Sequence, residues 1–153
     1  MTPGNATGRS ARPAADASPR ASTAKPPVRE GEKPWTAAEL RAVRAEIESD
    51  IASLTRDIAL HESDLAGLMR DSGDGSGDDE ADAGTKTYER EQEMTVGANA
   101  RDLLQQNQRA LERLDNGTYG RCENCGQPIG KLRLQAAPRA TLCLDCKRLE
   151  ERR

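Results

Sequence analysis

GTYGRCENCGQPIGKLRLQAAPRATLCLDC, residues 117–146, holds all four cysteines of the 153-residue chain. They form two Cys-x-x-Cys pairs separated by 17 residues: Cys122 with Cys125, and Cys143 with Cys146. Two such pairs place four thiolates at the corners of a tetrahedron, the geometry that Zn²⁺ adopts in structural sites. Gly126 allows the tight turn that points backbone N–H groups at the sulfur atoms. The spacing therefore predicts one zinc ion bound by the four cysteines.

Disulfide bonds are the alternative use of these cysteines. The first 30 residues contain no apolar stretch typical of a secretory signal, so we expect a cytoplasmic protein with reduced thiols. A site with four cysteine ligands has no open coordination position, so its zinc is expected to be structural. The sequence offers no pair of nucleophile and base, which argues against an enzyme. No run approaches 18 apolar residues, so we expect no membrane span.

The segment around the cysteines, residues 117–153, is too small to fold on its apolar side chains alone. These side chains are Ile129, Leu132, Leu134, Leu142, Leu144 and Leu149. Zinc binding contributes on the order of 10 kcal/mol to the folding of such modules. We therefore expect a small zinc finger that ends in a short helix.

Residues 35–116 are predicted to form two long helices. Thr36 can cap the first helix, Glu39 can return a hydrogen bond to the cap, and Trp35 and Leu40 flank it as an apolar staple. Large apolar residues then recur at steps of three and four, which indicates one helix face and a heptad seam. They are Leu40, Val43, Ile47, Ile51, Leu54, Ile58, Leu65 and Leu68.

His61, the only histidine, occupies the seam position between Ile58 and Leu65. A metal ligand or catalytic base would need partners that the sequence does not supply. A polar seam residue that helps to fix the register is the preferred interpretation.

A second helical stretch is predicted from about Thr85 to Asp115, with Asn116-Gly117 as its stop signal. Its expected inner face is Val96, Ala100, Leu103 or Leu104, Asn107, Leu111 and Leu114. Neither helix is apolar enough to stand alone, so we expect an antiparallel coiled-coil hairpin. A homodimer through the heptad face is the alternative.

Residues 71–85, DSGDGSGDDEADAGT, interrupt the helical pattern with four glycines and six acidic residues. Gly and Ser at this density break a helix, which places an acidic tip at the end of the hairpin. A calcium loop is disfavoured because the alternating acids and final Glu of an EF-hand loop are absent. A solvated loop and a functional acidic tip both remain open.

Composition leaves an elongated helical protein, a metal-stapled small domain, partial disorder or a mixture of these, and together with the helical periodicity we expect a mainly α fold with a tail. Leu, Ile and Val number 21 and Phe is absent, too little for a globular core of this length. Residues 1–34 contain Val28 as their only large aliphatic residue, so we expect them to be disordered. Net charge is +3 over residues 1–34, −10 over 35–118 and +4 over 119–153. The acidic middle indicates a basic partner surface rather than nucleic acid.

The cysteine region closely resembles the signature of the DksA/TraR family of four-cysteine zinc-finger transcription regulators. The matching positions outside the cysteines are Tyr119, Gly120, Ile129, Arg133, Leu134, Ala136, Pro138 and Ala140. The resemblance covers residues 117–153 strongly. It covers residues 35–116 by architecture, since the family carries a coiled-coil hairpin before the finger.

This resemblance implies a protein that binds RNA polymerase directly and not promoter DNA. In the family the hairpin enters the secondary channel of the polymerase, and acids at its tip act near the catalytic centre. The tip motif Asp-x-x-Asp-x-Ala matches best at residues 79–84, with Asp79 and Asp82 as the acids and Gly84 in place of Ala. Members of the family differ in their need for the nucleotide ppGpp, which is a possible ligand at the polymerase interface. Candidate docking residues in the finger are Arg133, Arg139, Lys147 and Arg148.

Two other functions compete with the polymerase-binding hypothesis. The first is a zinc finger that binds nucleic acid through its basic residues, although the module has neither a long recognition helix nor aromatic side chains for stacking. The second is a redox sensor in which oxidation of the thiols ejects the metal.

Overall fold

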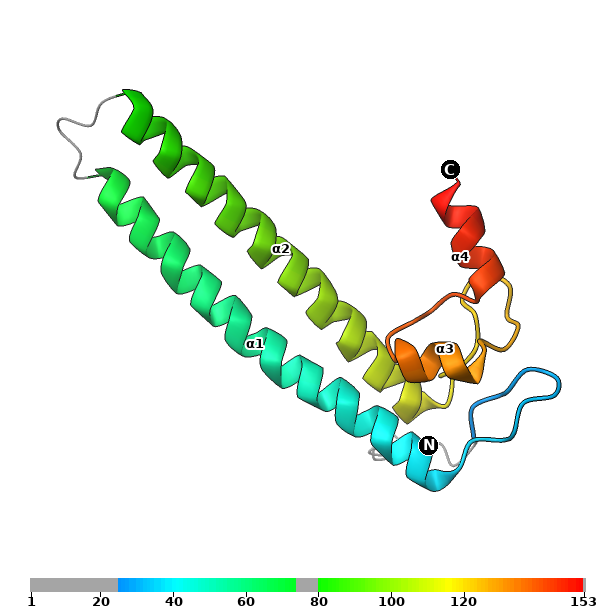
Figure 1. The fold of residues 1–153 in the computed structure, drawn as a ribbon. Coiled ribbons are helices and arrows are strands. Elements are labelled where there is room, and N and C mark those ends of the chain that lie inside the picture. The colour runs from blue at the N-terminus through cyan, green and yellow to red at the C-terminus, as the bar shows by residue number, and fades with distance from the viewer. Residues whose placement is uncertain (1–24, 74–79, 153) are drawn as a thin grey trace, which may run out of the picture.

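The computed structural model describes residues 25–73 and 80–152. Two long helices, α1 (Ala37–Gly73) and α2 (Glu80–Asn116), run antiparallel along each other as a hairpin (Figure 1). Two short helices, α3 (Lys131–Ala136) and α4 (Leu144–Glu151), belong to a C-terminal module at the base of the hairpin. The predicted mainly α fold, a helical hairpin followed by a four-cysteine module, is confirmed.

The start of α1 follows the predicted capping box. The hydroxyl of Thr36 accepts a hydrogen bond from the backbone N–H of Glu39 at 3.2 Å. The carboxylate of Glu39 accepts one from the backbone N–H of Thr36 at 2.8 Å. Trp35 is buried and Leu40 packs against the same core, which confirms the apolar staple.

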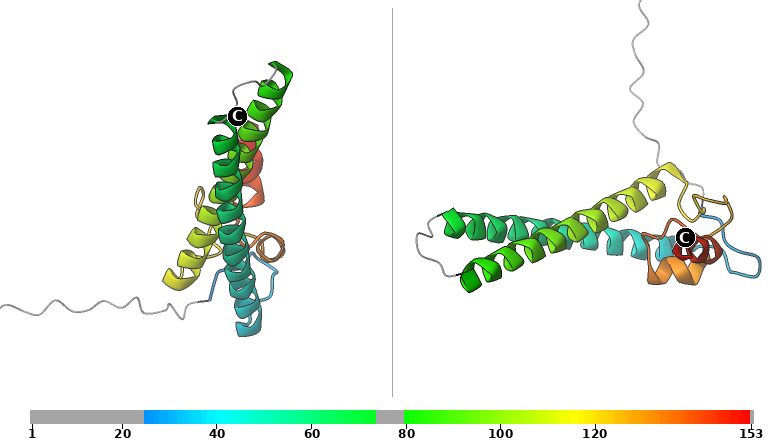
Figure 2. Two further views of the ribbon diagram at one scale, coloured as in Figure 1. Left: turned by 90° about the vertical axis from the view of Figure 1, so that its left-hand side faces the viewer. Right: turned by 90° about the horizontal axis from the view of Figure 1, so that it is seen from above.

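The half of the hairpin nearest the C-terminal module is the better packed half. Val43 and Ile47 of α1 are buried, as are Ala100 and Ala110 of α2. Asn107 is buried among them and donates its side-chain N–H to the carbonyl of Leu103 at 3.0 Å. In the right-hand view of Figure 2, which shows the hairpin from above, α1 and α2 cross one another.

The half of the hairpin nearest the tip lacks an apolar inner face on α2. Lys86, Arg90 and Glu93 are its half-buried residues. Glu93 lies 2.8 Å from Nδ1 of His61, which places His61 in the seam as predicted. Val96 was predicted to face inward, and that prediction is wrong: its side chain is 40% exposed. Gly97 is the buried neighbour, and a Cβ added there would lie 3.8 Å from that of His61.

Both long helices extend further into the acidic segment than predicted. Residues 71–73 continue α1 and residues 80–85 begin α2, so these parts of the predicted 71–85 interruption are helical. Glu80 and Asp82 lie in the first turn of α2, where acidic side chains interact favourably with the helix dipole. Residues 74–79, and with them Asp79, lie outside the described residues.

Residues 25–34 differ from the expected disordered tail. They have a defined path beside the C-terminal module (Figure 1), and Val28 packs against the core that surrounds Trp35. The average composition of residues 1–34 does not reveal this contact, because a few side chains are enough to hold a short segment against the C-terminal module. Residues 1–24 lie outside the described residues.

The core of the C-terminal module is smaller than predicted. Ile129 and Leu134 are fully buried, but Leu132, Leu144 and Leu149 are 79%, 44% and 58% exposed. Tyr119 is part of the core as well: it is 1% exposed, and its hydroxyl donates to the carbonyl of Pro138 at 2.9 Å. Across the described part of the chain, no helix has both the length and the apolar character that crossing a membrane requires.

Candidate metal centre and hairpin tip

The four cysteines converge on one point in the C-terminal module. The sulfur atoms of Cys122, Cys125, Cys143 and Cys146 all lie within 4.8 Å of one another. The sulfurs of Cys125 and Cys143 are 3.8 Å apart. A tetrahedral zinc with Zn–S bonds of about 2.3 Å requires S···S separations of about 3.8 Å. The cluster therefore fits one zinc ion, held by all four thiolates.

Local backbone geometry presents the first cysteine pair. The N–H of Gly126 donates to the carbonyl of Cys122 at 2.9 Å, and the N–H of Cys122 donates to the carbonyl of Gln127 at 2.8 Å. Gly126 has a φ of 72°, in the left-handed region where a side chain is disfavoured. These bonds close the tight turn that the sequence predicts after the first pair.

The second cysteine pair lies at the start of α4. Cys143 is the residue immediately before the helix and Cys146 is in its first turn. The side chain of Asn124 links the two pairs, because its N–H donates to the sulfur of Cys146 at 3.2 Å. A helix N-terminus and an amide N–H both favour anionic sulfur, the form that binds zinc.

The thiols of Cys122 and Cys146 differ in their tendency to ionise. Burial raises the pKa of Cys122, but N–H groups of Cys143, Cys125 and Asn124 directed at its sulfur outweigh burial and lower the pKa to about 6. The Asn124 amide favours the thiolate of Cys146, but burial and the three neighbouring thiols raise its pKa to about 12. Four neighbouring thiolates repel one another without a cation, and a divalent metal ion removes that repulsion.

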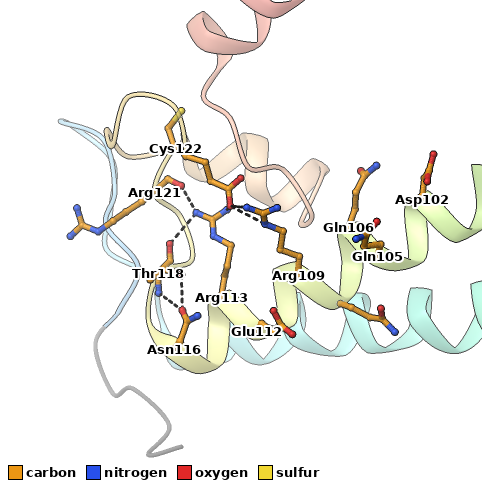
Figure 3. Close-up of a pocket in the computed structure, with 12 residues that line it drawn as sticks. Asp102, Gln105, Gln106, Arg109, Glu112, Arg113, Asn116, Thr118, Arg121 and Cys122 are labelled. Carbon is orange, nitrogen blue, oxygen red and sulfur yellow. Dashed lines mark hydrogen bonds and ion pairs between the residues drawn. The ribbon is translucent and has the colours of Figure 1, made fainter.

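A buried arginine attaches this module to α2. Arg113 is 7% exposed and donates to the carbonyl of Thr118 at 3.1 Å and to the carbonyl of Arg121 (Figure 3). Arg109, one turn earlier, pairs with Glu123 at 2.9 Å. Arg121 directly precedes Cys122, and Thr118 lies four residues before it, so the Arg113 side chain orients the metal site relative to the hairpin.

Of the predicted tip acids, Asp82 lies at the opposite end of the molecule from the cysteines. Asp82 is an exposed residue in the first turn of α2, at the distal end of the hairpin (Figure 1). Its predicted companion Asp79 is outside the described residues. The structure therefore separates the metal centre from Asp82 by the length of α2.

The four candidate docking residues differ in their exposure and in the partners that they have within the chain. Arg133 donates to the carbonyl of Leu142 at 3.1 Å, which gives it a structural role. Lys147 pairs with Glu150 at 2.8 Å within α4. Arg139 is half-buried and Arg148 is exposed on α4. Arg148 is thus the most accessible of the four.

Sequence analysis missed the structural roles of Arg113 and Lys131. Each was one cation among many, with no local pattern to distinguish it. Lys131 lies 2.8 Å from the carboxylate of Glu39 and 5.2 Å from the centre of the Trp35 ring. These partners are about 90 residues away in sequence, so only the fold reveals them.

Comparison with known proteins agrees with this geometry. The model of the prokaryotic dksA/traR C4-type zinc finger matches residues 117–152. The RNA polymerase-binding transcription factor DksA of Haemophilus influenzae is 40% identical over 73 residues, which are 48% of this chain and 50% of that protein. The protein of the same name from Caulobacter vibrioides is 37% identical over 75 residues, 49% of this chain and 53% of that protein. The chain thus matches about half the length of these curated relatives.

A solved structure extends the similarity to the hairpin. The transcription factor DksA2 of Pseudomonas aeruginosa is 30% identical to this chain, with a TM-score of 0.62. The match covers 76% of this chain and 85% of the DksA2 chain, so it includes long helices as well as the finger. On the shared finger, the shared fold and the converging cysteines, this chain belongs to the DksA/TraR family of C4-type zinc-finger proteins.

Proposed function

We propose that this protein is a transcription regulator that binds RNA polymerase directly and inserts its hairpin into the secondary channel. The observation that carries the proposal is that Asp71, Glu80 and Asp82 are exposed at the far end of a slender hairpin whose base carries the four-cysteine module. Relatives named RNA polymerase-binding transcription factors support the choice of partner. Such a partner implies a cytoplasmic site of action and a regulatory, not enzymatic, role.

The dimensions of the hairpin suit a narrow channel. Each long helix has 37 residues, which corresponds to about 55 Å at 1.5 Å per residue. Two packed helices form a rod only two helix diameters wide. Its distal half exposes many polar side chains, so it can enter a water-filled channel without a large desolvation cost.

The chemistry of the tip suits a cationic target. Asp71, Glu80 and Asp82 are exposed at the distal ends of the two helices. Carboxylates brought near a bound Mg²⁺ or a basic loop change the local electrostatics of an active centre. We assign the regulatory effect to Asp79 and Asp82, and assign binding to the hairpin and the finger.

The finger supplies the remaining docking contacts in this proposal. Arg139 and Arg148 are its candidates, whereas Arg133 and Lys147 already hold partners within the chain. The nucleotide ppGpp is a further candidate ligand at the polymerase interface, and its addition to the binding assay below tests that assignment.

The experiment is a pull-down with purified RNA polymerase, challenged by a competitor that fills the secondary channel, together with transcription in vitro. The double variant Asp79→Asn, Asp82→Asn is expected to bind polymerase normally and to lose its effect on transcription. The matched control is Asp57→Asn, Asp102→Asn, which makes the same charge change away from the tip. Normal regulation by the tip variant would overturn the tip assignment.

Binding to DNA is the competing outcome of the same set of assays. A gel-shift titration with DNA alone separates the two functions. Tight, salt-sensitive binding without polymerase would favour a nucleic-acid-binding finger. A redox-sensing role has one observation in its favour, the exposure of Cys125. Retention of zinc under mild peroxide would argue against it.

A further inference from the structure

Residues 25–36, here called the strap, cross the zinc-binding module before α1 begins. Their first contact is with Gly120, where an added Cβ would lie 3.1 Å from Pro26 and 3.5 Å from the carbonyl oxygen of Pro27. Gly120 also has a φ of 82°, so glycine is required there for two reasons. Pro26 and Pro27 limit the conformations of the free strap and reduce the entropy lost when it docks.

The second contact is a turn closed by one carboxylate. The N–H of Glu32 donates to the carbonyl of Arg29 at 3.1 Å, and the N–H of Arg29 donates to the Glu32 carboxylate at 2.9 Å. The other oxygen of that carboxylate accepts the backbone N–H of Lys131 at 2.9 Å. Glu32 therefore joins the strap to the first residue of α3.

The third contact is the side chain of Lys131, which is only 13% exposed. Its ammonium group lies 3.4 Å from the carbonyl oxygens of Lys33 and Pro34. The same group lies over the Trp35 ring and pairs with Glu39. Docking of the strap thus continues directly into the capped start of α1.

Between these contacts the strap shares a cavity with three of the cysteines. Val28, Arg29 and Glu30 line a cavity of about 410 Å³ that is also lined by Cys125, Cys143 and Cys146. Cys122 and Cys146 are buried and Cys143 is half-buried, but Cys125 is exposed. A chelator or thiol reagent must reach the sulfur atoms, and this cavity is bordered by three of the four cysteines.

We propose that the strap controls access to the zinc thiolates, so that the metal is released faster when the strap is detached. Steric cover comes from Val28, which packs against the core, and from the turn that Glu32 closes.

The test measures zinc release from the full-length, zinc-loaded protein into an excess of a chelating dye. Glu32→Ala removes the carboxylate that closes the turn, and Val28→Ser removes the apolar anchor. Both are expected to release zinc several-fold faster than the parent chain. Glu32→Gln keeps an acceptor oxygen and is expected to fall between the parent and Glu32→Ala.

Glu30→Ala is the matched control, because Glu30 lies two residues from Glu32 and lines the same cavity. It makes the same change of charge without opening the turn, and its release rate is expected to stay near that of the parent. Circular dichroism and zinc stoichiometry before mixing verify the fold of each variant. If Glu32→Ala does not take up zinc, the rate of zinc release from Val28→Ser decides whether the proposal holds.

Equal rates for the parent, Glu32→Ala and Val28→Ser would overturn the proposal. Equal acceleration by Glu30→Ala and Glu32→Ala would also overturn it, because loss of a negative charge and not release of the strap would then be the cause. RNA polymerase takes no part in these measurements, so their result is independent of the proposed function.

Discussion

The ammonium group of Lys131 lies 2.8 Å from the carboxylate of Glu39, which joins the first residue of α3 to the first turn of α1. The same carboxylate receives the capping hydrogen bond from the N–H of Thr36. The Glu39 carboxylate therefore takes part both in the cap of α1 and in an ion pair between segments more than 90 residues apart. This relationship sets how the zinc module is seated on the hairpin.

The first prediction concerns the titration of Glu39. Its hydrogen bond to Lys131, helped by the N–H of Thr36, lowers the pKa of Glu39 from 4.5 to about 2. A lowered pKa means that the pair contributes stability above pH 4.5, which is lost only as the pH falls toward 2. Lys131→Met is expected to return the pKa toward 4.5.

Carbon-13 NMR of the Glu39 carboxyl group between pH 6 and 4 measures this difference. The parent chain is expected to show little change over that range, whereas the variant begins to titrate. Cobalt substituted for zinc reports by its absorbance whether the metal site stays intact during the titration. Identical titration curves would show that the ion pair does not determine this pKa.

The second prediction concerns Arg113. Arg113→Met keeps much of the volume of this buried side chain but removes its hydrogen bonds to the carbonyls of Thr118 and Arg121, at an expected cost of about 2 to 4 kcal/mol in the free energy of unfolding. Arg109→Met is the control: the side chain of Arg109 is 61% exposed, so its loss should cost less than about 1 kcal/mol. Urea unfolding followed by circular dichroism compares them. Similar losses in both variants would contradict the anchoring role of Arg113.

The third prediction concerns two glycines within α2. Gly84 has no atom within 4 Å of an added Cβ, so Gly84→Ala is expected to stabilise the helix by about 0.5 to 1 kcal/mol. Gly97 is buried opposite His61, so a large side chain there must push the two helices apart. Gly97→Leu is expected to destabilise the hairpin by about 1 to 3 kcal/mol despite its better helix propensity.

Amide hydrogen exchange distinguishes these two variants. Gly84→Ala is expected to slow exchange in the first turns of α2, from Glu80 onward. Gly97→Leu is expected to speed exchange in both long helices. If both substitutions slowed exchange, the close approach at Gly97 would not limit the packing of the hairpin.

Sequence alone determined the features that depend on neighbours a few residues apart. The Thr36–Glu39 cap, the stop at Asn116-Gly117 and the two cysteine knuckles are of this kind. Each is a local motif whose geometry follows from residue type and spacing. Gly117 has a φ of 78°, as a left-handed stop requires. The heptad pattern of α1 also predicted its inner face, because apolar side chains recur there at helical spacing.

Tertiary structure decided the features that depend on which segments meet. Helical periodicity could not tell that Gly97, and not Val96, faces α1, because the distal part of α2 has charged residues where an apolar stripe would mark the inner face. Composition assigned residues 25–34 to a tail, whereas Glu32 and Lys131 dock them onto the finger. A hydrogen bond between residues 99 positions apart leaves no periodic trace in the sequence, since its energy appears only after the chain has brought the two groups together.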